Sequence, residues 1–319
     1  MKKILAVLCA VCIVFALGAT AFAAEYNVGV CQLVQHPALD AATQGFIDAL
    51  TEKAGEGVVD VNWQNGSGDS ATCSVIVNQF VSDEVDLIMA NATPALVAAG
   101  GATSTIPILG TSITAYAAAF EIEEDWADRS FALNVSGTSD LAPLDEQAAM
   151  LNAFFPEAKN VGILYCSGEP NSKFQVETIT PILEGFGYTV NLYSFADSNE
   201  VTSMTMTAVE ENDVLYIPTD NTAASCAEAI NNIALPAGVP IIAGESGLCK
   251  GCGIATLSID YYELGRATGE MAYEILVNGA DVSTMEIQYS PEFTKMYNPV
   301  ICEALGIEVP EDYIAIDMD

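Results

Sequence analysis

Short polar side chains recur where an apolar stretch of strand length ends and a helix begins. The clearest case is the segment 215–230 (LYIPTDNTAASCAEAI), in which a short apolar strand stops at Pro218 and is followed by Asp220 and Asn221. Open α/β sheets bind ligands beyond the carboxyl ends of their strands, next to helix N-termini. Asp and Asn also cap helices very often, so helix capping remains an equal explanation for each residue alone.

The other predicted strand ends carry side chains of the same kind. The candidate ligand-binding residues are Gln32, Thr93, Ser112 and Thr114 in the first half and Glu169, Asn171, Asp220, Asn221 and Glu245 in the second. The three hydroxyls, together with helix N-terminal amides, could hold a ligand carboxylate without any arginine. The three acidic side chains could pair with an ammonium group. One half therefore suits an anion and the other a cation, as a zwitterionic amino acid requires.

The sequence lacks the residue combinations that hydrolytic catalysis requires. His36 is the only histidine, and the chain contains no G-x-S-x-G elbow, so a nucleophile and its base are not both present. Near a helix start the cationic imidazole is disfavoured, which leaves a neutral packing role and a ligand contact equally open for His36. The acids at 169, 220 and 245 could suggest glycoside hydrolysis, but in this setting they suit ammonium binding better. We expect no catalytic residue and no cofactor.

Cys249 and Cys252 form a Cys-x-x-Cys pair, which could be a redox or metal site, a local disulfide or two inert thiols. A second such pair and a nearby histidine are both absent from the sequence, so we expect no metal. We also expect that both cysteines can be replaced by serine with little loss of ligand affinity.

Residues 1–24 have the features of a secretory signal: Lys2 and Lys3, an apolar run, and small residues before the polar chain begins at Glu25. An uncleaved membrane anchor is the less favoured alternative. The cysteines in the apolar run lack a lipoprotein context, so we expect a periplasmic or extracellular protein without a lipid anchor. The formal net charge of −34 repels phosphate backbones and anionic lipid, which argues against nucleic-acid and membrane-surface binding.

Strands and helices are predicted to alternate in two successive series. Expected strands are 26–33, 58–64, 85–92, 106–113 and 131–135, and then 160–166, 188–195, 213–218, 239–244 and 253–259. The apolar runs lack strict alternation, which is typical of parallel strands covered on both faces. The two series predict an α/β protein with two doubly wound lobes, each built on a parallel sheet.

Six segments together resemble a known family. They are NVGVCQLVQHPALDAATQGFIDAL, WQNGSGD, FVSDEVDLIMANATPAL, GEPNS, YIPTDNT and DYYELGRATGEMAYEIL. In this order they resemble the ABC transporter substrate-binding proteins of the tryptophan or aromatic amino acid-binding type. The resemblance covers nearly all of the chain after the expected signal, and its joint pattern is more specific than any single motif.

The resemblance implies a type I periplasmic-binding fold, with two lobes joined by a three-segment hinge and the ligand in the cleft between them. The implied organisation is a signal peptide at 1–24, lobe I at 25–135 plus 257–289, and lobe II at 136–256 plus 290–319. The family's ligand-contacting stretches fall on the candidate residues given above, apart from Thr114.

The chain departs from the family pattern at three places. Ala115-Tyr116 replaces a usual Asp-Pro, Glu245 replaces a usual Asp, and Cys249 and Cys252 are not typical. We expect the Tyr116 ring to lie close to the cleft, where it would affect which ligand side chain is accepted.

The resemblance favours a receptor that captures an amino acid, with an aromatic one preferred, and delivers it to an ABC permease driven by an ATPase. The alternatives are a receptor for branched-chain or other apolar amino acids, and a sensor that docks on a receptor ectodomain. We expect a monomer. We also expect Asp220→Ala to abolish ligand binding and to leave the fold intact.

Overall fold

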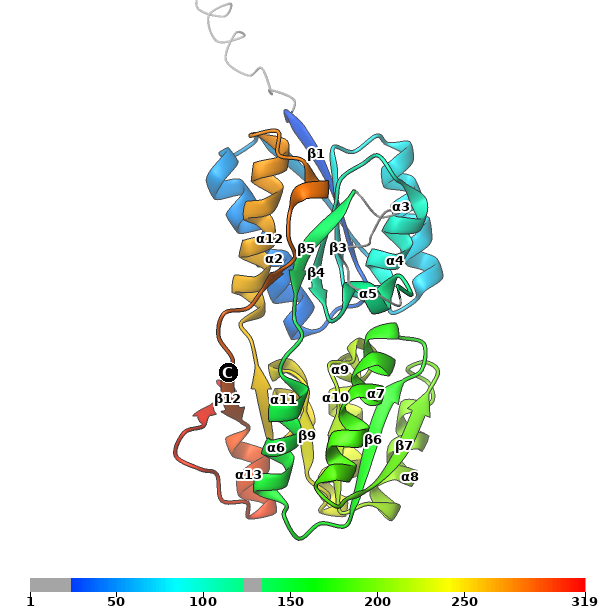
Figure 1. The fold of residues 1–319 in the computed structure, drawn as a ribbon, viewed down its shortest axis with the longest axis vertical. Coiled ribbons are helices and arrows are strands. Elements are labelled where there is room, and N and C mark those ends of the chain that lie inside the picture. Colours follow the sequence, from blue (N-terminus) through cyan, green and yellow to red (C-terminus); the bar gives the residue numbers. More distant parts are fainter. Residues whose placement is uncertain (1–23, 123–133, 319) are drawn as a thin grey trace, which may run out of the picture.

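Two sheets organise the part of the chain described by this computed structural model, residues 24–122 and 134–318. The expected signal segment lies almost wholly outside these residues. Each sheet is covered by helices on both faces, and most strands of both sheets end toward the junction between them (Figure 1). We call the first sheet with its helices lobe I and the second lobe II. The expected pair of doubly wound α/β lobes is confirmed.

Lobe I contains a six-stranded sheet in the order β11-β5-β4-β3-β1-β2. Its strands are β1 (Tyr26–Gln32), β2 (Val59–Asn65), β3 (Leu87–Asn91), β4 (Ile108–Ile113), β5 (Val135–Ser139) and β11 (Gln288–Tyr289). Its helices are α2 (Pro37–Ala54), α3 (Ser70–Ser82), α4 (Thr93–Ala102), α5 (Tyr116–Ala119) and α12 (Tyr261–Leu276), with a 3-10 turn at Val282–Thr284. Its strand pairs are parallel.

Lobe II contains a seven-stranded sheet in the order β13-β12-β10-β9-β8-β6-β7. Its strands are β6 (Asn160–Cys166), β7 (Thr189–Phe195), β8 (Val214–Ile217), β9 (Ile241–Ala243), β10 (Ala255–Ser258), β12 (Thr294–Tyr297) and β13 (Ile314–Ala315). Its helices are α6 (Leu144–Phe154), α7 (Pro170–Gly185), α8 (Val201–Glu211), α9 (Asn221–Ser225), α10 (Ala227–Ala237), α11 (Ser246–Cys252) and α13 (Pro299–Leu305). Only the β10–β12 pair is antiparallel within this described sheet.

The described chain crosses between the lobes three times, after β5, after β10 and after β11. The expected boundaries at 136 and 257 fall inside β5 and β10, so these two crossings lie a few residues later than expected. The expected strand at 131–135 begins outside the described residues, and the strand found there is β5. The end of β5 was misplaced because polar residues such as Ser136 and Ser139 continue its ladder inside a buried sheet.

Helix α12 returns the chain to lobe I by packing tightly against α2. Asp260 caps α12 by accepting the backbone N–H groups of Tyr262 and Glu263. Glycine makes the close approach possible, because a methyl group at Gly265 would overlap the backbone carbonyl oxygen of Ala42. Lobe I therefore depends on a helix contact between segments more than two hundred residues apart.

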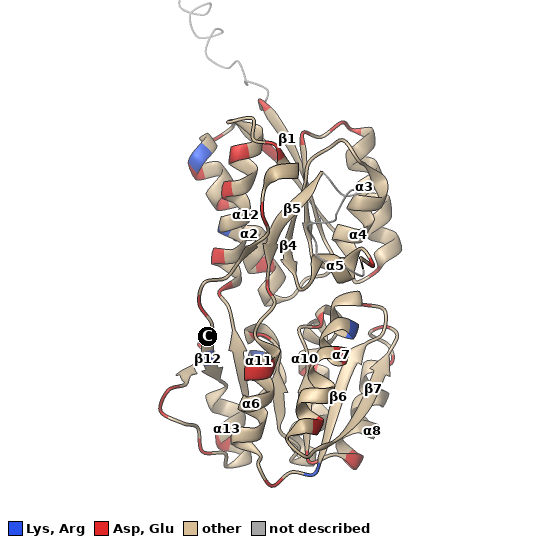
Figure 2. Ribbon diagram, in the orientation of Figure 1, with Lys and Arg blue, Asp and Glu red and all other residues tan. Residues whose placement is uncertain are grey.

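Acidic residues are spread over both lobes, and basic ones are few (Figure 2). The cations form scattered exposed pairs, such as Arg266 with Glu52 at 2.7 Å and Lys295 with Asp312 at 2.8 Å. Exposed pairs of this kind stabilise a fold weakly. None of the described helices combines the length and the apolar character that crossing a membrane requires.

The α2–α12 contact predicts that Gly265→Ala lowers the free energy of unfolding by roughly 1–3 kcal/mol, because the added methyl forces the helices apart. Urea or thermal unfolding measures the loss. Gly185→Ala, at the end of α7, is the matched control, since its added methyl meets no atom within 4 Å. Equal stability of the two variants would contradict the importance of this contact.

Candidate functional site

The strand ends of the two lobes meet and bury the nine candidate residues between or beside them. None of the nine is more than 6% exposed. His36, at the start of α2 in lobe I, contacts lobe II directly, with its Nε2 atom 3.2 Å from Oδ1 of Asn221. The lobes of this structure are therefore closed on each other at this point.

Glu169 is the centre of the hydrogen-bond network on the lobe II side. Its Oε2 atom accepts the side-chain amides of Asn171 (3.1 Å) and Asn221 (2.6 Å) and the backbone N–H of Asn221 (3.2 Å). Its Oε1 atom accepts the backbone N–H and the hydroxyl of Thr222 at 2.8 and 2.7 Å. Every partner is a donor, so both oxygens of this buried carboxyl act as acceptors.

Asp220 lies beside Glu169 and joins three elements of lobe II. It accepts the backbone N–H of Cys166 (2.6 Å), the hydroxyl of Ser172 (2.7 Å) and the backbone N–H of Ala223 (2.8 Å). The pKa of Asp220 is raised to about 7, mainly by burial and secondly by the nearby charge of Glu169. The structure contradicts the premise that Asp220 makes few contacts, and Asp220→Ala would leave these buried donors unpaired, so we now expect it to destabilise lobe II.

Three candidate side chains already form hydrogen bonds with protein groups of their own part of the structure. Both oxygens of Glu245 accept backbone N–H groups of α11, and burial raises the pKa of Glu245 to about 7. The amide of Gln32 bonds to Asp40 and Thr43 inside lobe I. Thr114 donates to Asp140 at 3.1 Å. These side chains position the strand ends and have few donors or acceptors left for a ligand.

Among the candidate residues and His36, four buried polar atoms have no hydrogen-bond partner within the residues that the structure describes. They are Oγ1 of Thr93, Oγ of Ser112, Oδ1 of Asn171 and Nδ1 of His36. Such atoms are costly unless a ligand or water satisfies them, so a group of four marks a binding site. The backbone here is unusual as well, with φ of 84° at Ala92 and 56° at Ser112. Backbone strain of this kind gathers at functional sites.

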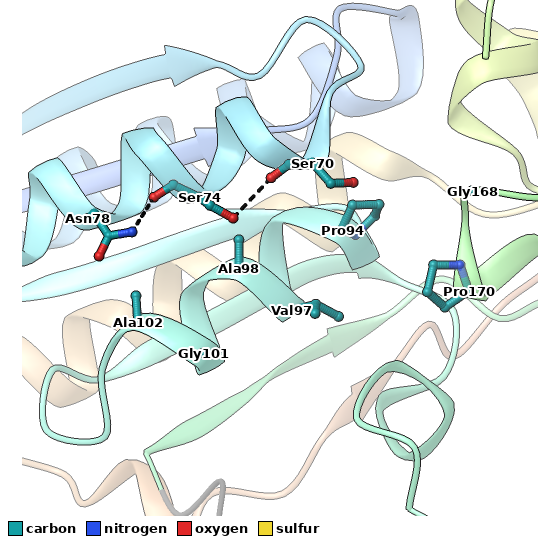
Figure 3. Close-up of a pocket in the computed structure, with 10 residues that line it drawn as sticks. All are labelled: Ser70, Ser74, Asn78, Pro94, Val97, Ala98, Gly101, Ala102, Gly168 and Pro170. Atoms are coloured by element: carbon teal, nitrogen blue, oxygen red, sulfur yellow. Dashed lines mark hydrogen bonds between the residues drawn. The ribbon is translucent and has the colours of Figure 1, made fainter. Parts of the chain in front are cut away.

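Two pockets open along the junction between the lobes, although the four residues named above are not among their lining residues. One, of about 470 Å³, is lined by side chains of α3 and α4 and by Gly168 and Pro170 from lobe II (Figure 3). The other, of about 420 Å³, includes Glu169 and Thr222 in its lining. Both contain Ser70, Pro94 and Gly168, so they form neighbouring parts of one groove between the lobes.

Sequence reasoning missed the residues at the hinge. Asp140, in the first crossing, accepts the hydroxyl of Tyr261 at 3.0 Å in addition to that of Thr114. Burial raises the pKa of Asp140 to about 6. Its position directly after a predicted crossing was the available signal. The expectation for Tyr116 is wrong, since its ring packs in the lobe I core and its hydroxyl lies 3.1 Å from the Gly110 carbonyl oxygen.

Cys249 and Cys252 are free thiols buried in α11. Burial raises the pKa of Cys252 and so keeps its thiol protonated. Within the described residues, no group of three or more His, Cys, Asp and Glu side chains is placed to hold a metal ion.

Sequence and structure comparisons identify the family. The sequence profile of the ABC transporter substrate binding proteins matches residues 27–317. The chain belongs to this family. A tyrosine-binding protein of Clostridioides difficile (strain R20291) is 35% identical over 287 residues, which cover 89% of this chain and 82% of that protein.

Two solved structures of relatives differ in state. The ABC domain from Streptococcus pneumonia in complex with L-Trp is 30% identical, with a TM-score of 0.83, over 90% of this chain and 96% of its own. The ligand-free, open structure of a substrate-binding protein with adhesive properties from Clostridium difficile is 37% identical, over 92% and 100%, yet its TM-score is 0.66. The expected type I periplasmic-binding fold is confirmed. The lobe arrangement of this structure is nearer to that of the complex.

The hinge carboxyl predicts a pH effect on the ligand-free protein. The pKa of Asp140 is about 6 in the fold against an ordinary 3.8, so the folded state retains a proton that the unfolded state releases between these values. Stability contributed by this proton is present near pH 4 and is lost as pH rises through 6. Asp140→Asn should flatten the fall in unfolding free energy over this range by about 1–3 kcal/mol.

Asp213→Asn is the matched control for this measurement. Backbone N–H groups of Asn160 and Lys159 lower the pKa of Asp213, so this substitution should remove stability that is lost as pH falls. Urea titrations from pH 3 to 7 on both variants separate the two signs, because the effect of Asp213 lies at the acidic end of this range and that of Asp140 between pH 4 and 6. The same slope in Asp140→Asn and the wild type would contradict the assignment to Asp140.

Proposed function

We propose that the protein is the extracytoplasmic receptor of an ABC importer and captures an aromatic amino acid between its lobes. The observation that carries the proposal is the pairing of unpartnered hydroxyls on lobe I with an acidic, acceptor-rich surface on lobe II. The tyrosine-binding relative and the relative in complex with L-Trp favour an aromatic side chain over a branched one.

The ligand carboxylate would lie against lobe I. Thr93 and Ser112 offer hydroxyl donors, and the start of α4 adds the positive end of a helix dipole. These neutral donors can bind a carboxylate without a cationic side chain.

The ligand ammonium would lie against lobe II. Asn171 Oδ1 is an acceptor without a partner among the described residues, and its own amide is held by Glu169. Since Glu169 already accepts five donors, its charge attracts the ammonium while Asn171 supplies the direct contact. Asp220 and Asn221 hold this arrangement in place, and Gln32, Thr114 and Glu245 position the neighbouring strand ends.

In this proposal a signal at residues 1–24 directs export, and the monomeric closed form docks on a permease driven by an ATPase. Ligand binding stabilises the closed form over the open one, so that docking reports on occupancy. Capture and release require no bond to be made or broken, and the proposal assigns the protein no catalytic role.

A ligand panel tests the proposal. The protein is unfolded and refolded to remove carried ligand, and its melting temperature is measured with each of the twenty amino acids, several nucleosides and several sugars. We expect the shift to be confined to Tyr, Trp and Phe, because only a ligand that binds the native state raises the melting temperature. A shift with Leu, Ile or Val alone would replace the aromatic ligand, and a response only to sugars or nucleosides would refute amino acid binding.

The proposed carboxylate contact predicts that Thr93→Val weakens tyrosine binding by about tenfold or more and leaves the melting temperature of the ligand-free protein unchanged. Calorimetric titration measures the affinity. Thr268→Val is the matched control, because its buried hydroxyl bonds to Leu264 and Thr138 within lobe I. That control should lose stability and retain affinity, and the reverse pattern would remove Thr93 from the site.

A further inference from the structure

His36 bridges the two lobes from a buried position and is 7% exposed. It precedes Pro37 at the start of α2, and its Nε2 atom meets Oδ1 of Asn221 at the start of α9. Its second ring nitrogen, Nδ1, has no hydrogen-bond partner among the described residues. One nitrogen therefore joins the lobes, and the other remains available at the candidate site.

The hydrogen bonds of lobe II determine which nitrogen of His36 carries the proton. Glu169 accepts from five donors, so the amide group of Asn221 that lies 2.6 Å from it must be the NH₂ group. The oxygen of the Asn221 amide then faces His36 and can only accept. His36 Nε2 is therefore the donor, and in a neutral ring Nδ1 is a bare acceptor.

The ring is neutral in the closed form. Burial lowers the pKa of His36, and this effect outweighs the opposing influences of the Asn221 hydrogen bond and of the nearby Glu169 and Asp40 carboxylates. Nδ1 consequently offers a lone pair in a buried place that no described protein donor reaches. A buried acceptor without a donor costs free energy, which the closed form would bear whenever the site is empty.

We infer that His36 Nδ1 accepts a hydrogen bond from the ligand's ammonium group and thereby makes lobe closure conditional on the ligand. This inference rests on the proposed function. Asn171 and Asn221 both donate to the same oxygen of Glu169, at 3.1 and 2.6 Å, so Asn171 Oδ1 and the His36–Asn221 pair are held on one scaffold. An ammonium group has several N–H bonds and can satisfy both acceptors beside the Glu169 charge.

The consequence is a bond between the lobes that is favourable only when the site is filled. Without ligand, closure forms the His36–Asn221 bond and leaves Nδ1 unpaired. With ligand, closure forms the same bond and pairs Nδ1 as well. A ligand shifts an equilibrium only by its differential interaction with the two states, and this contact exists in the closed state alone.

Nuclear magnetic resonance of the single histidine tests the inference directly. Because the sequence contains one histidine, protein with isotopically labelled histidine and no purification tag gives one imidazole signal set. With L-tyrosine bound, we expect the proton on Nε2 and a nitrogen shift at Nδ1 typical of a hydrogen-bonded acceptor. A proton on Nδ1, a doubly protonated ring, or a bare Nδ1 in the complex would each overturn the inference.

Affinity measurements separate ligand contact from lobe contact. His36→Leu removes both hydrogen bonds of the ring, whereas His36→Gln retains a donor and an acceptor. We expect His36→Leu to weaken L-tyrosine binding by about tenfold or more and His36→Gln to restore part of the loss. Desaminotyrosine, which lacks the ammonium group, should lose much less affinity in His36→Leu than L-tyrosine does.

An equal loss for both ligands would overturn the inference, because His36 would then act only between the lobes. Wild-type protein that binds L-tyrosine but fails the resonance test leaves the proposed function standing and removes the role of His36. Wild-type protein that binds none of the aromatic amino acids refutes the proposed function and this inference together.

Discussion

Burial of carboxylates between two lobes is the constraint on which the rest of the structure depends. A carboxylate removed from water is costly unless donors surround it, and Glu169, Asp220 and Glu245 are each at most 3% exposed. Lobe II meets the requirement with backbone N–H groups at the starts of α9 and α11 and with the amides and hydroxyls beside them. The positions of these helix starts are therefore tied to the positions of the charges.

The same constraint separates supporting groups from binding groups. A side chain whose bonds are all made inside one lobe, such as Gln32, fixes the strand end and has little left for a ligand. A side chain with an atom left over, such as Ser112, can bind something that is not protein. Closing the lobes over such atoms is unfavourable by itself, so closure and binding are linked through solvation as well as through contact.

The sequence predicted the fold well. For the site it predicted which residues lie at the junction, and their individual roles were not predicted. Alternation of apolar runs with helical stretches was sufficient for two doubly wound lobes, because parallel strands buried on both faces have a distinct pattern. The return of α12 to lobe I followed only from family resemblance, since its cause is a glycine contact with α2 that no local pattern contains. The end of β5 was missed because polar residues continue its buried ladder.

The roles of individual site residues lay beyond the sequence for a related reason. Strand-end position predicts that a side chain reaches the junction, but the direction of its bonds depends on neighbours distant in the chain. Glu245 matched the pattern for an ammonium ligand, and its oxygens are used to cap its own helix. Tyr116 followed a strand end and turned into the core. The role of His36 was left undecided, because the position of its proton depends on residues distant in the chain. Asn221 accepts from the ring, and Glu169 fixes the orientation of the Asn221 amide.

The scarcity of cationic side chains affects which ligand charges each lobe can accept. In the described part of the chain, the unpartnered polar atoms at the strand ends belong to Thr, Ser, Asn and His, and none to Lys or Arg. An anion entering alone would meet only neutral donors on lobe I and the negative charge of Glu169 on lobe II. A zwitterion avoids this repulsion when its ammonium faces lobe II and its carboxylate faces lobe I. The proposed arrangement would thus select a dipolar ligand in one orientation, and an acidic protein could bind a carboxylate because the ligand itself brings the compensating charge.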